Sequence, residues 1–97
     1  MKTQLRIYTI NRGQLHQFAK EWEEKIRPLR ESLGFQVAAA WLLEETSQFV
    51  WLLIYDGPQP WETLDAAYYT SPTRLAMNPN PARLIARAEE YFAEKAF

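Results

Sequence analysis

The sequence predicts one α+β domain built on an antiparallel sheet that is covered on both faces. Two apolar runs, FQVAAAWLL and FVWLLIY, are joined by the polar stretch Glu44–Gln48, which indicates a β-hairpin from Phe35 to Tyr55. Neither run alternates between apolar and polar residues, so both faces of the hairpin are apolar. An antiparallel sheet with one face in water would alternate, and we therefore expect a covering layer on each side.

The segments before the hairpin predict a strand and an amphipathic helix. Thr3–Ile10 has the composition of a first strand. From Leu15 to Leu33, apolar residues recur every three or four positions, as they do on one face of a helix. Pro28 has no backbone N–H to donate, so we expect a kink or a break of the helix near Lys25.

The segments after the hairpin predict short helices and one ambiguous end. Trp61–Tyr69 has helical spacing, and Ser71 and Asn80 each precede a proline, which is typical of a helix start. The last stretch, ARLIARAEEYFAEKAF, has the composition of a helix. A fourth strand at the same place would instead complete two β-α-β halves, so both readings stay open from the residues alone.

Composition excludes several classes of function. The 97 residues include 11 basic and 12 acidic side chains, for a net charge of -1, without a basic cluster that would favour nucleic acid or an anionic membrane. There is no cysteine, and one histidine with scattered carboxylates does not make a metal site, so we expect neither a metal nor a cofactor. The N-terminus has no continuous hydrophobic segment, which predicts a soluble cytoplasmic protein. The length predicts a single domain over residues 1–97.

Five segments of the chain resemble, in this order, landmarks of the NIPSNAP domain. They are LRIYTINRGQLHQF, IRPLRESLGFQV, AAWLLEE, FVWLLIYD and DAAYYTSPTRLAMNPNPARLI, and they span nearly the whole chain. The resemblance implies the dimeric α/β-barrel, ferredoxin-like group: a four-stranded antiparallel sheet with helices on one face and the sheet of a second subunit on the other. It also implies a homodimer, and a strand at roughly residues 88–95 despite their helical composition.

The length of the hairpin turn determines where the tryptophans point. If Glu45–Ser47 forms a three-residue turn, Trp41 pairs with Trp51 and Leu43 with Phe49, so that one face holds the large aromatic rings. A two- or four-residue turn would shift the pairing by one residue and scatter the tryptophans.

A ligand site is expected on the aromatic face, in the space between the two sheets of the dimer. If Leu5 and Ile7 face the helices, this space is lined by Arg6, Tyr8, Trp41, Trp51 and Tyr55. Such a cavity would suit a small aromatic or carboxylated ligand. The alternative is that the tryptophans fill the dimer core and that Arg6 pairs with an acidic residue of the other subunit.

The roles of Tyr68 and His16 can each be interpreted in two ways. Tyr68 shares a helical face with Trp61 and Leu64, which favours it as a cavity residue, but the pair Tyr68-Tyr69 could simply anchor the end of the helix. His16 lies beside the apolar stripe and is expected in solvent. A role as heme ligand or general base is the alternative, for which the sequence holds no second landmark.

Three functions are consistent with these observations. The first is a NIPSNAP-like homodimer that binds a small molecule in the intersheet cleft, with no nucleic acid or membrane partner. The second is a cofactor-independent monooxygenase or isomerase in which Arg6 holds an anionic oxygen and Tyr8 or Tyr55 donates a proton. The third is a structural interaction module. Fold alone does not decide between them, and whether the protein is an enzyme stays open.

Overall fold

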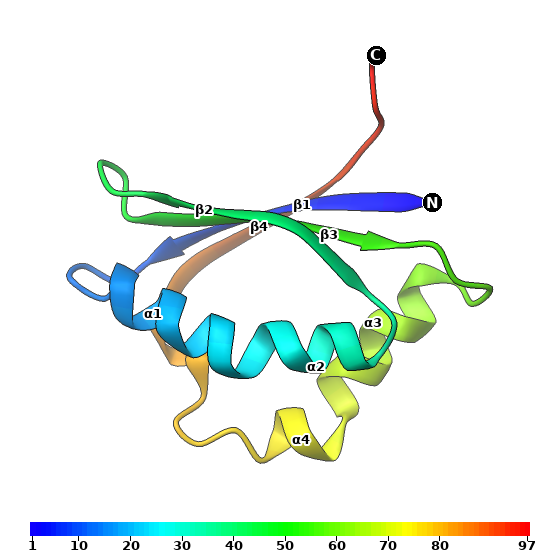
Figure 1. Cartoon of the computed structure of the whole chain (residues 1–97). Coiled ribbons are helices and arrows are strands. Elements are labelled where there is room, and N and C mark those ends of the chain that lie inside the picture. Colours follow the sequence, from blue (N-terminus) through cyan, green and yellow to red (C-terminus); the bar gives the residue numbers. More distant parts are fainter.

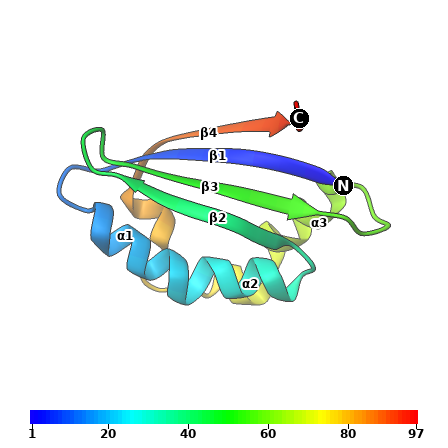
Figure 2. The same ribbon diagram turned by 45° about the horizontal axis from the view of Figure 1, so that its top comes forward.

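The computed structural model describes residues 1–97 and shows a four-stranded antiparallel sheet with every helix on one face (Figure 1). The strands β1 (Lys2–Ile10), β2 (Gln36–Leu43), β3 (Gln48–Tyr55) and β4 (Ile85–Ala93) lie in the order β2-β3-β1-β4 (Figure 2). This is the ferredoxin-like arrangement, so the predicted α+β fold is confirmed. The C-terminal segment forms strand β4 because pairing along β1 outweighs its helical composition.

The first helical segment is continuous but not uniform. It consists of α1 (Leu15–Glu21), the π-helical turn η1 (Trp22–Ile26) and α2 (Arg27–Ser32). The N–H of Arg27 donates to the carbonyl of Trp22, five residues earlier, which is the wide spacing of a π-helix. The irregularity lies where Pro28 was expected to disturb the helix, because its ring would collide with the carbonyl of a regular preceding turn.

The second half of the chain starts its short helices at the predicted caps. Helix α3 (Trp61–Thr70) is followed by α4 (Pro72–Leu75), and the Ser71 hydroxyl accepts the Arg74 N–H at 3.1 Å. The 3₁₀ turn η2 (Pro81–Leu84) begins in the same way, with Asn80 Oδ1 accepting the Ala82 N–H at 3.0 Å. No helix has the length and hydrophobicity needed to cross a membrane.

The hydrophobic core lies between the sheet and the helices and is rich in aromatic rings. Phe18 packs edge-on against Phe49 with ring centroids 5.2 Å apart, and Trp22 packs against Trp51 at 5.4 Å. These contacts explain why the large rings of β3 face the helices: they fill the core that the helical stripe requires.

The hairpin has a four-residue turn, so the predicted three-residue register is wrong. Leu43 pairs with Gln48, and Ser47 adopts a positive φ of 55° at the end of the turn. Trp41 consequently pairs with Val50 and not with Trp51. A bulge between Val37 and Ala39 shifts the register again further along β2.

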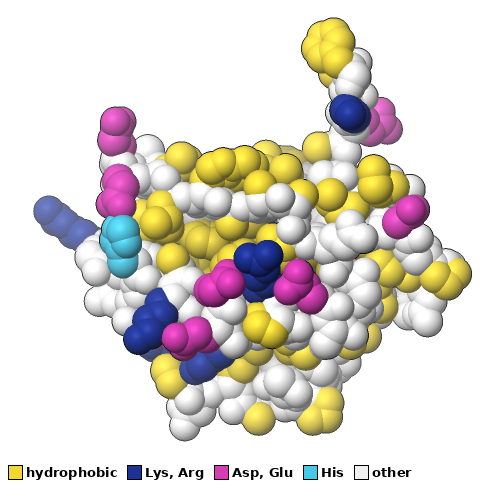
Figure 3. Space-filling view, viewed as in Figure 1, with side chains coloured by type: hydrophobic (Ala, Val, Ile, Leu, Met, Phe, Trp, Pro, Cys, Tyr) yellow, Lys and Arg dark blue, Asp and Glu magenta, His cyan; other side chains and the backbone are white.

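The opposite face of the sheet is apolar and nothing in the subunit covers it. Figure 1 shows no helix above the sheet, and Figure 3 shows hydrophobic side chains gathered there. Trp41 is 48% exposed and Tyr91 is 52% exposed. From the strand registers we define the open face by Leu5, Ile7, Trp41, Leu43, Val50, Leu52, Ile54 and Tyr91. An uncovered apolar area of this kind is typical of an interface.

Candidate ligand-binding cavity

Four of the candidate residues point from the sheet towards the helices. Arg6 and Tyr8 of β1 and Trp51 and Tyr55 of β3 are all buried in the single subunit. They share one face of the sheet, because Arg6 pairs directly with Trp51. The expected location in the space between two sheets is therefore wrong: this face packs on the helices, and Leu5 and Ile7 lie on the open face instead.

Trp41 is separated from these residues by the thickness of the sheet. Its partner across the hairpin is Val50, whose neighbour Trp51 points the opposite way. The expectation that Trp41 and Trp51 line one cavity is therefore wrong, and the cause is the four-residue turn. Trp41 belongs to the open face.

Arg6 is fully buried and is held from several directions. Its side chain has no exposed surface, so every one of its donors needs a partner inside the protein. Glu90 of β4 lies 3.4 Å from Nη1. The hydrogen bonds of Arg6 go to Gln4 Oε1 (2.7 Å from Nε), the hydroxyls of Tyr8 and Tyr69 (3.3 and 3.2 Å from Nη1) and Asp65 Oδ1 (3.2 Å from Nη2).

Asp65 of α3 joins two buried arginines. Its Oδ1 accepts from Arg6 and also from Arg30 Nη1, the latter at 2.7 Å. The central carbon of the Arg30 guanidinium lies 3.7 Å from the centroid of the Tyr68 ring, within cation–π distance. This cluster ties β1, α2 and α3 together through charge inside the core.

A small cavity lies beside this cluster, between the helices and the sheet. Its volume is about 100 Å³. Glu90 and Ala88 lie on its β4 side, where both residues are exposed. The lining consists of Tyr8, Ile26, Arg30, Trp51, Tyr68, Tyr69, Arg74, Ala82, Ile85, Ala88 and Glu90.

Three N–H groups of the lining residues are buried without a hydrogen-bond partner. They are Nε of Arg30, Nε of Arg74 and the indole Nε1 of Trp51. Buried donors are paired in the great majority of cases, so three orphans around one small space are unusual. Residues that line the cavity thus carry donors that the protein itself does not use.

Burial sets the protonation of the groups around the cavity. It raises the pKa of Tyr8 and of Tyr68, so both phenols are neutral at physiological pH. Burial acts to lower the pKa of Arg6, but the phenol oxygens of Tyr8 and Tyr69 outweigh it and the pKa is raised. The cavity therefore combines fixed positive charge with neutral hydroxyl groups.

The remaining candidates divide between the cavity and its surroundings. Tyr68 is buried and lines the cavity, together with Tyr8 and Trp51. Tyr55 lies at the other end of β3, where its hydroxyl accepts the Gln59 N–H at 3.2 Å. Arg6 does not line the cavity itself, but it donates hydrogen bonds to two residues that do, Tyr8 and Tyr69.

Sequence reasoning missed Arg30, Asp65, Tyr69, Arg74 and Glu90. Arg30 falls among the polar positions of the helical stripe, and only the π-turn brings it inside. Tyr69 and Asp65 lie in the segment that contains the Tyr68-Tyr69 pair. That pair indicated a possible site, but the sequence did not decide whether it contacts a ligand or anchors the end of the helix. Arg74 and Glu90 carried no signal in the sequence.

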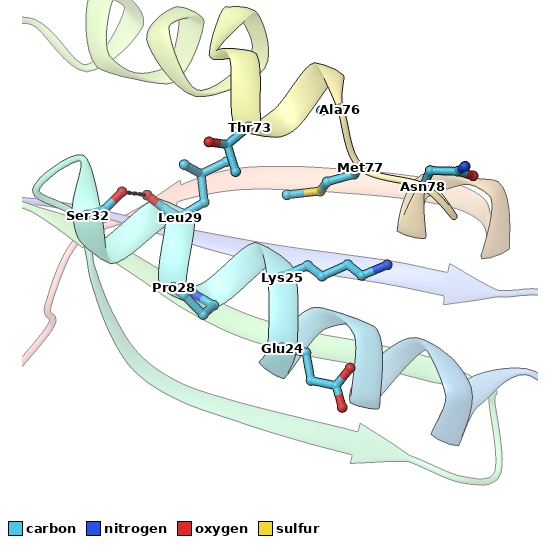
Figure 4. Close-up of a pocket in the computed structure, with 9 residues that line it drawn as sticks. All are labelled: Glu24, Lys25, Pro28, Leu29, Ser32, Thr73, Ala76, Met77 and Asn78. Atoms are coloured by element: carbon cyan, nitrogen blue, oxygen red, sulfur yellow. Dashed lines mark hydrogen bonds between the residues drawn. The ribbon is translucent and has the colours of Figure 1, made fainter.

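Other surface features offer less enclosed sites. His16 lies in solvent as expected, with its side chain 72% exposed and Nε2 2.6 Å from Glu44 Oε1. A groove of about 530 Å³ runs between α2 and α4 and is drawn in Figure 4. Only three of its nine lining residues are hydrophobic, and its one cation, Lys25, is bound to the carbonyl of Pro79.

Comparison with known proteins shows the fold. No family model matches the chain, and no curated protein matches it. An uncharacterized NIPSNAP domain protein from Burkholderia xenovorans has a TM-score of 0.84 at 17% identity, over 99% of this chain and 95% of that one. A NIPSNAP family protein of unknown function from Agrobacterium tumefaciens has a TM-score of 0.86 at 18% identity, over 99% and 88%.

The fold is also similar to that of an enzyme class. An antibiotic biosynthesis monooxygenase has a TM-score of 0.70 at 8% identity, over 99% of both chains. This likeness is weaker than that to the NIPSNAP domain structures, and at this identity it concerns the fold alone.

Proposed function

Since the chain has the fold of NIPSNAP domain proteins, as its sequence resemblance predicts, we propose that it is a homodimeric domain that binds a small molecule inside each subunit. The observation that carries the proposal is the cavity next to Arg6, Arg30 and Asp65. Two buried guanidinium groups on one carboxylate are a costly way to hold a core together, since apolar residues of similar size commonly do so better. Charged groups beside a cavity are characteristic of a ligand site.

The dimer is supported by the open face. Leu52 lies near its centre, opposite Leu5 of β1. A second copy stacked on this face would remove the exposed surface of Trp41 and Tyr91 from water and give the sheet its second layer. The ligand site would then lie on the helix side of each subunit, away from the interface.

Native mass spectrometry of the protein as purified from cells tests both parts. We expect a dimer that carries one small molecule per subunit. Leu52→Asp places a charge in the centre of the open face and should give a folded monomer. Ala66→Asp adds the same charge on the exposed side of α3 and should leave the dimer intact.

A cavity-filling variant locates the ligand. Ala88→Leu extends a lining side chain into a space of about 100 Å³ and should reduce the bound molecule. Ala40→Leu makes the same change on β2, outside the lining, and should not. A dimer that is empty in every preparation would contradict ligand binding and favour a structural interaction module. A wild-type monomer would contradict the dimer.

A cofactor-independent monooxygenase is the second candidate, supported by the fold likeness to an antibiotic biosynthesis monooxygenase. Tyr8 is a suitable proton donor because its raised pKa keeps the hydroxyl protonated. The test is oxygen consumption with acetoin, an enolisable four-carbon ketone small enough for the cavity of about 100 Å³, as the probe. Uptake by the wild type that Tyr8→Phe abolishes would support the enzyme, and equal uptake by both proteins would contradict this role.

A further inference from the structure

The geometry points to a carboxylate as the group that this cavity binds: a short-chain organic acid held by Arg30, Arg74 and Trp51, with its carbons against the apolar wall. This inference rests on the proposed function, which puts a small molecule in the cavity. It goes further by naming the chemical class of that molecule.

The unused donors are the first reason. Arg30 is 1% exposed and Trp51 has no exposed surface, yet Arg30 Nε and Trp51 Nε1 donate to nothing in the protein. Arg74, which also lines the cavity, carries a third such group at its Nε. A buried donor without a partner has lost its hydrogen bond to water, so a ligand that accepts from these three groups restores a lost interaction for each of them.

The tyrosine hydroxyls add two more donors. Tyr8 and Tyr69 both accept from Arg6 Nη1, and neither hydroxyl donates its own hydrogen to a protein acceptor. Both residues line the cavity. Apart from the hydroxyl oxygens of the three lining tyrosines, Tyr68 included, the acceptor that the lining side chains offer is the carboxylate of Glu90, which lies 3.4 Å from Arg6. A ligand that fits this wall must therefore be chiefly an acceptor.

The side chains of the cluster and the cavity wall carry a net positive charge, which favours an anionic ligand. Arg6, Arg30 and Arg74 bring three positive charges to the cluster and the cavity wall, against two negative charges from Asp65 and Glu90. One carboxylate would make the count equal. Because Arg6 and Arg30 are buried, an anion next to them would be stabilised by charges that water screens only weakly.

Shape and size select among anions. A carboxylate is planar and offers two oxygens, which matches guanidinium and indole donors around one point. Ile26, Ile85 and the ring of Tyr68 form an apolar wall for carbon atoms. An apolar cavity of about 150 Å³ holds benzene, so a volume of about 100 Å³ suits an acid with roughly four carbons.

Isobutyrate and its neutral isostere isobutyramide provide the test. Both are titrated into the ¹⁵N-labelled wild-type protein while the indole N–H signals of the four tryptophans are followed. We expect isobutyrate to shift the Trp51 signal, identified with Trp51→Phe, and to leave that of Trp41 in place. Isobutyramide should bind at least tenfold more weakly because it carries no charge.

Two arginine variants make the test specific. Arg74→Gln removes one of the unused donors and should weaken isobutyrate binding at least tenfold. Arg12→Gln removes an exposed arginine from the turn before α1 and should leave the affinity unchanged. If Arg74→Gln does not fold, the Trp51 signal of the wild-type protein still decides the question.

The outcomes separate this inference from the proposed function. Equal affinity for isobutyrate and isobutyramide at Trp51 would overturn the carboxylate and keep the ligand site. No binding of either compound, together with a neutral molecule found by native mass spectrometry, would do the same. No binding of either compound and an empty dimer would overturn both.

Discussion

Arg30 Nη1 and Asp65 Oδ1 are 2.7 Å apart, and this hydrogen bond links α2 to α3 inside the core. Because Asp65 also accepts from Arg6, its carboxylate compensates two buried charges at once. The stability of the subunit and the shape of the cavity therefore depend on the same group.

Asp65→Asn should destabilise the fold by about 3 kcal/mol, because two buried guanidinium groups lose the charge that they share. The free energy of unfolding in urea measures the effect. Glu23→Gln removes an exposed partner of Arg27 at 3.2 Å and should cost less than about 1 kcal/mol. Equal losses for the two variants would contradict a special role of the buried carboxylate.

The stability of the protein should fall between pH 4.5 and pH 2 in a way that depends on Glu21. Hydrogen bonds from Arg83, at 2.7 and 2.8 Å, lower the pKa of Glu21 from 4.5 to about 2. A depressed pKa in the folded state contributes stability above the unfolded value of 4.5, and this contribution is lost as the pH falls towards 2. Urea midpoints between pH 2 and 6 measure it.

Glu21→Gln is the matching variant for this pH dependence. It should be less stable than the wild type at pH 6, and the difference should shrink as the pH falls from 4.5 to 2. Glu24→Gln, on an exposed position of the same helix, should follow the wild-type curve. A constant difference between Glu21→Gln and the wild type over this range would contradict the lowered pKa.

Tryptophan fluorescence should report on the open face. Trp41 is 48% exposed in the subunit, whereas Trp22, Trp51 and Trp61 are 4% exposed or less. If a second copy covers Trp41, dilution below the dimer dissociation constant should shift the emission to longer wavelength and increase quenching by iodide. Trp41→Phe should remove most of this concentration dependence. Emission that stays constant while the mass falls from dimer to monomer would contradict an interface at Trp41.

The order of strands and helices could be predicted from local patterns and the family resemblance. The amphipathic stripe from Leu15 to Leu33, the caps at Ser71 and Asn80 and the hairpin all carry their signals within a few residues. Strand β4 could not be read from composition, because pairing with β1 is a long-range contact that only the resemblance implied.

The location of the site could not be predicted, because it depends on one turn residue and on packing across layers. The turn holds four residues and ends at Ser47 in a positive φ, and its length places Trp41 on the open face. The choice of face for Arg6 depends on which side the helices cover, and both faces of the hairpin are apolar. Asp65 and Arg30 are 35 residues apart in the chain, so no local pattern joins them.

The π-turn at Trp22–Ile26 acts as a rotational offset between the two ends of its helix. One extra residue in a turn rotates everything after it by roughly 100° relative to a regular α-helix. In a regular helix Arg30 would lie towards the edge of the stripe formed by Phe18 and Trp22, and the offset turns it to the centre. This rotation places the Arg30 guanidinium next to the cavity. A regular α-helix could cover the same sheet, but its residue 30 would lie away from the cavity.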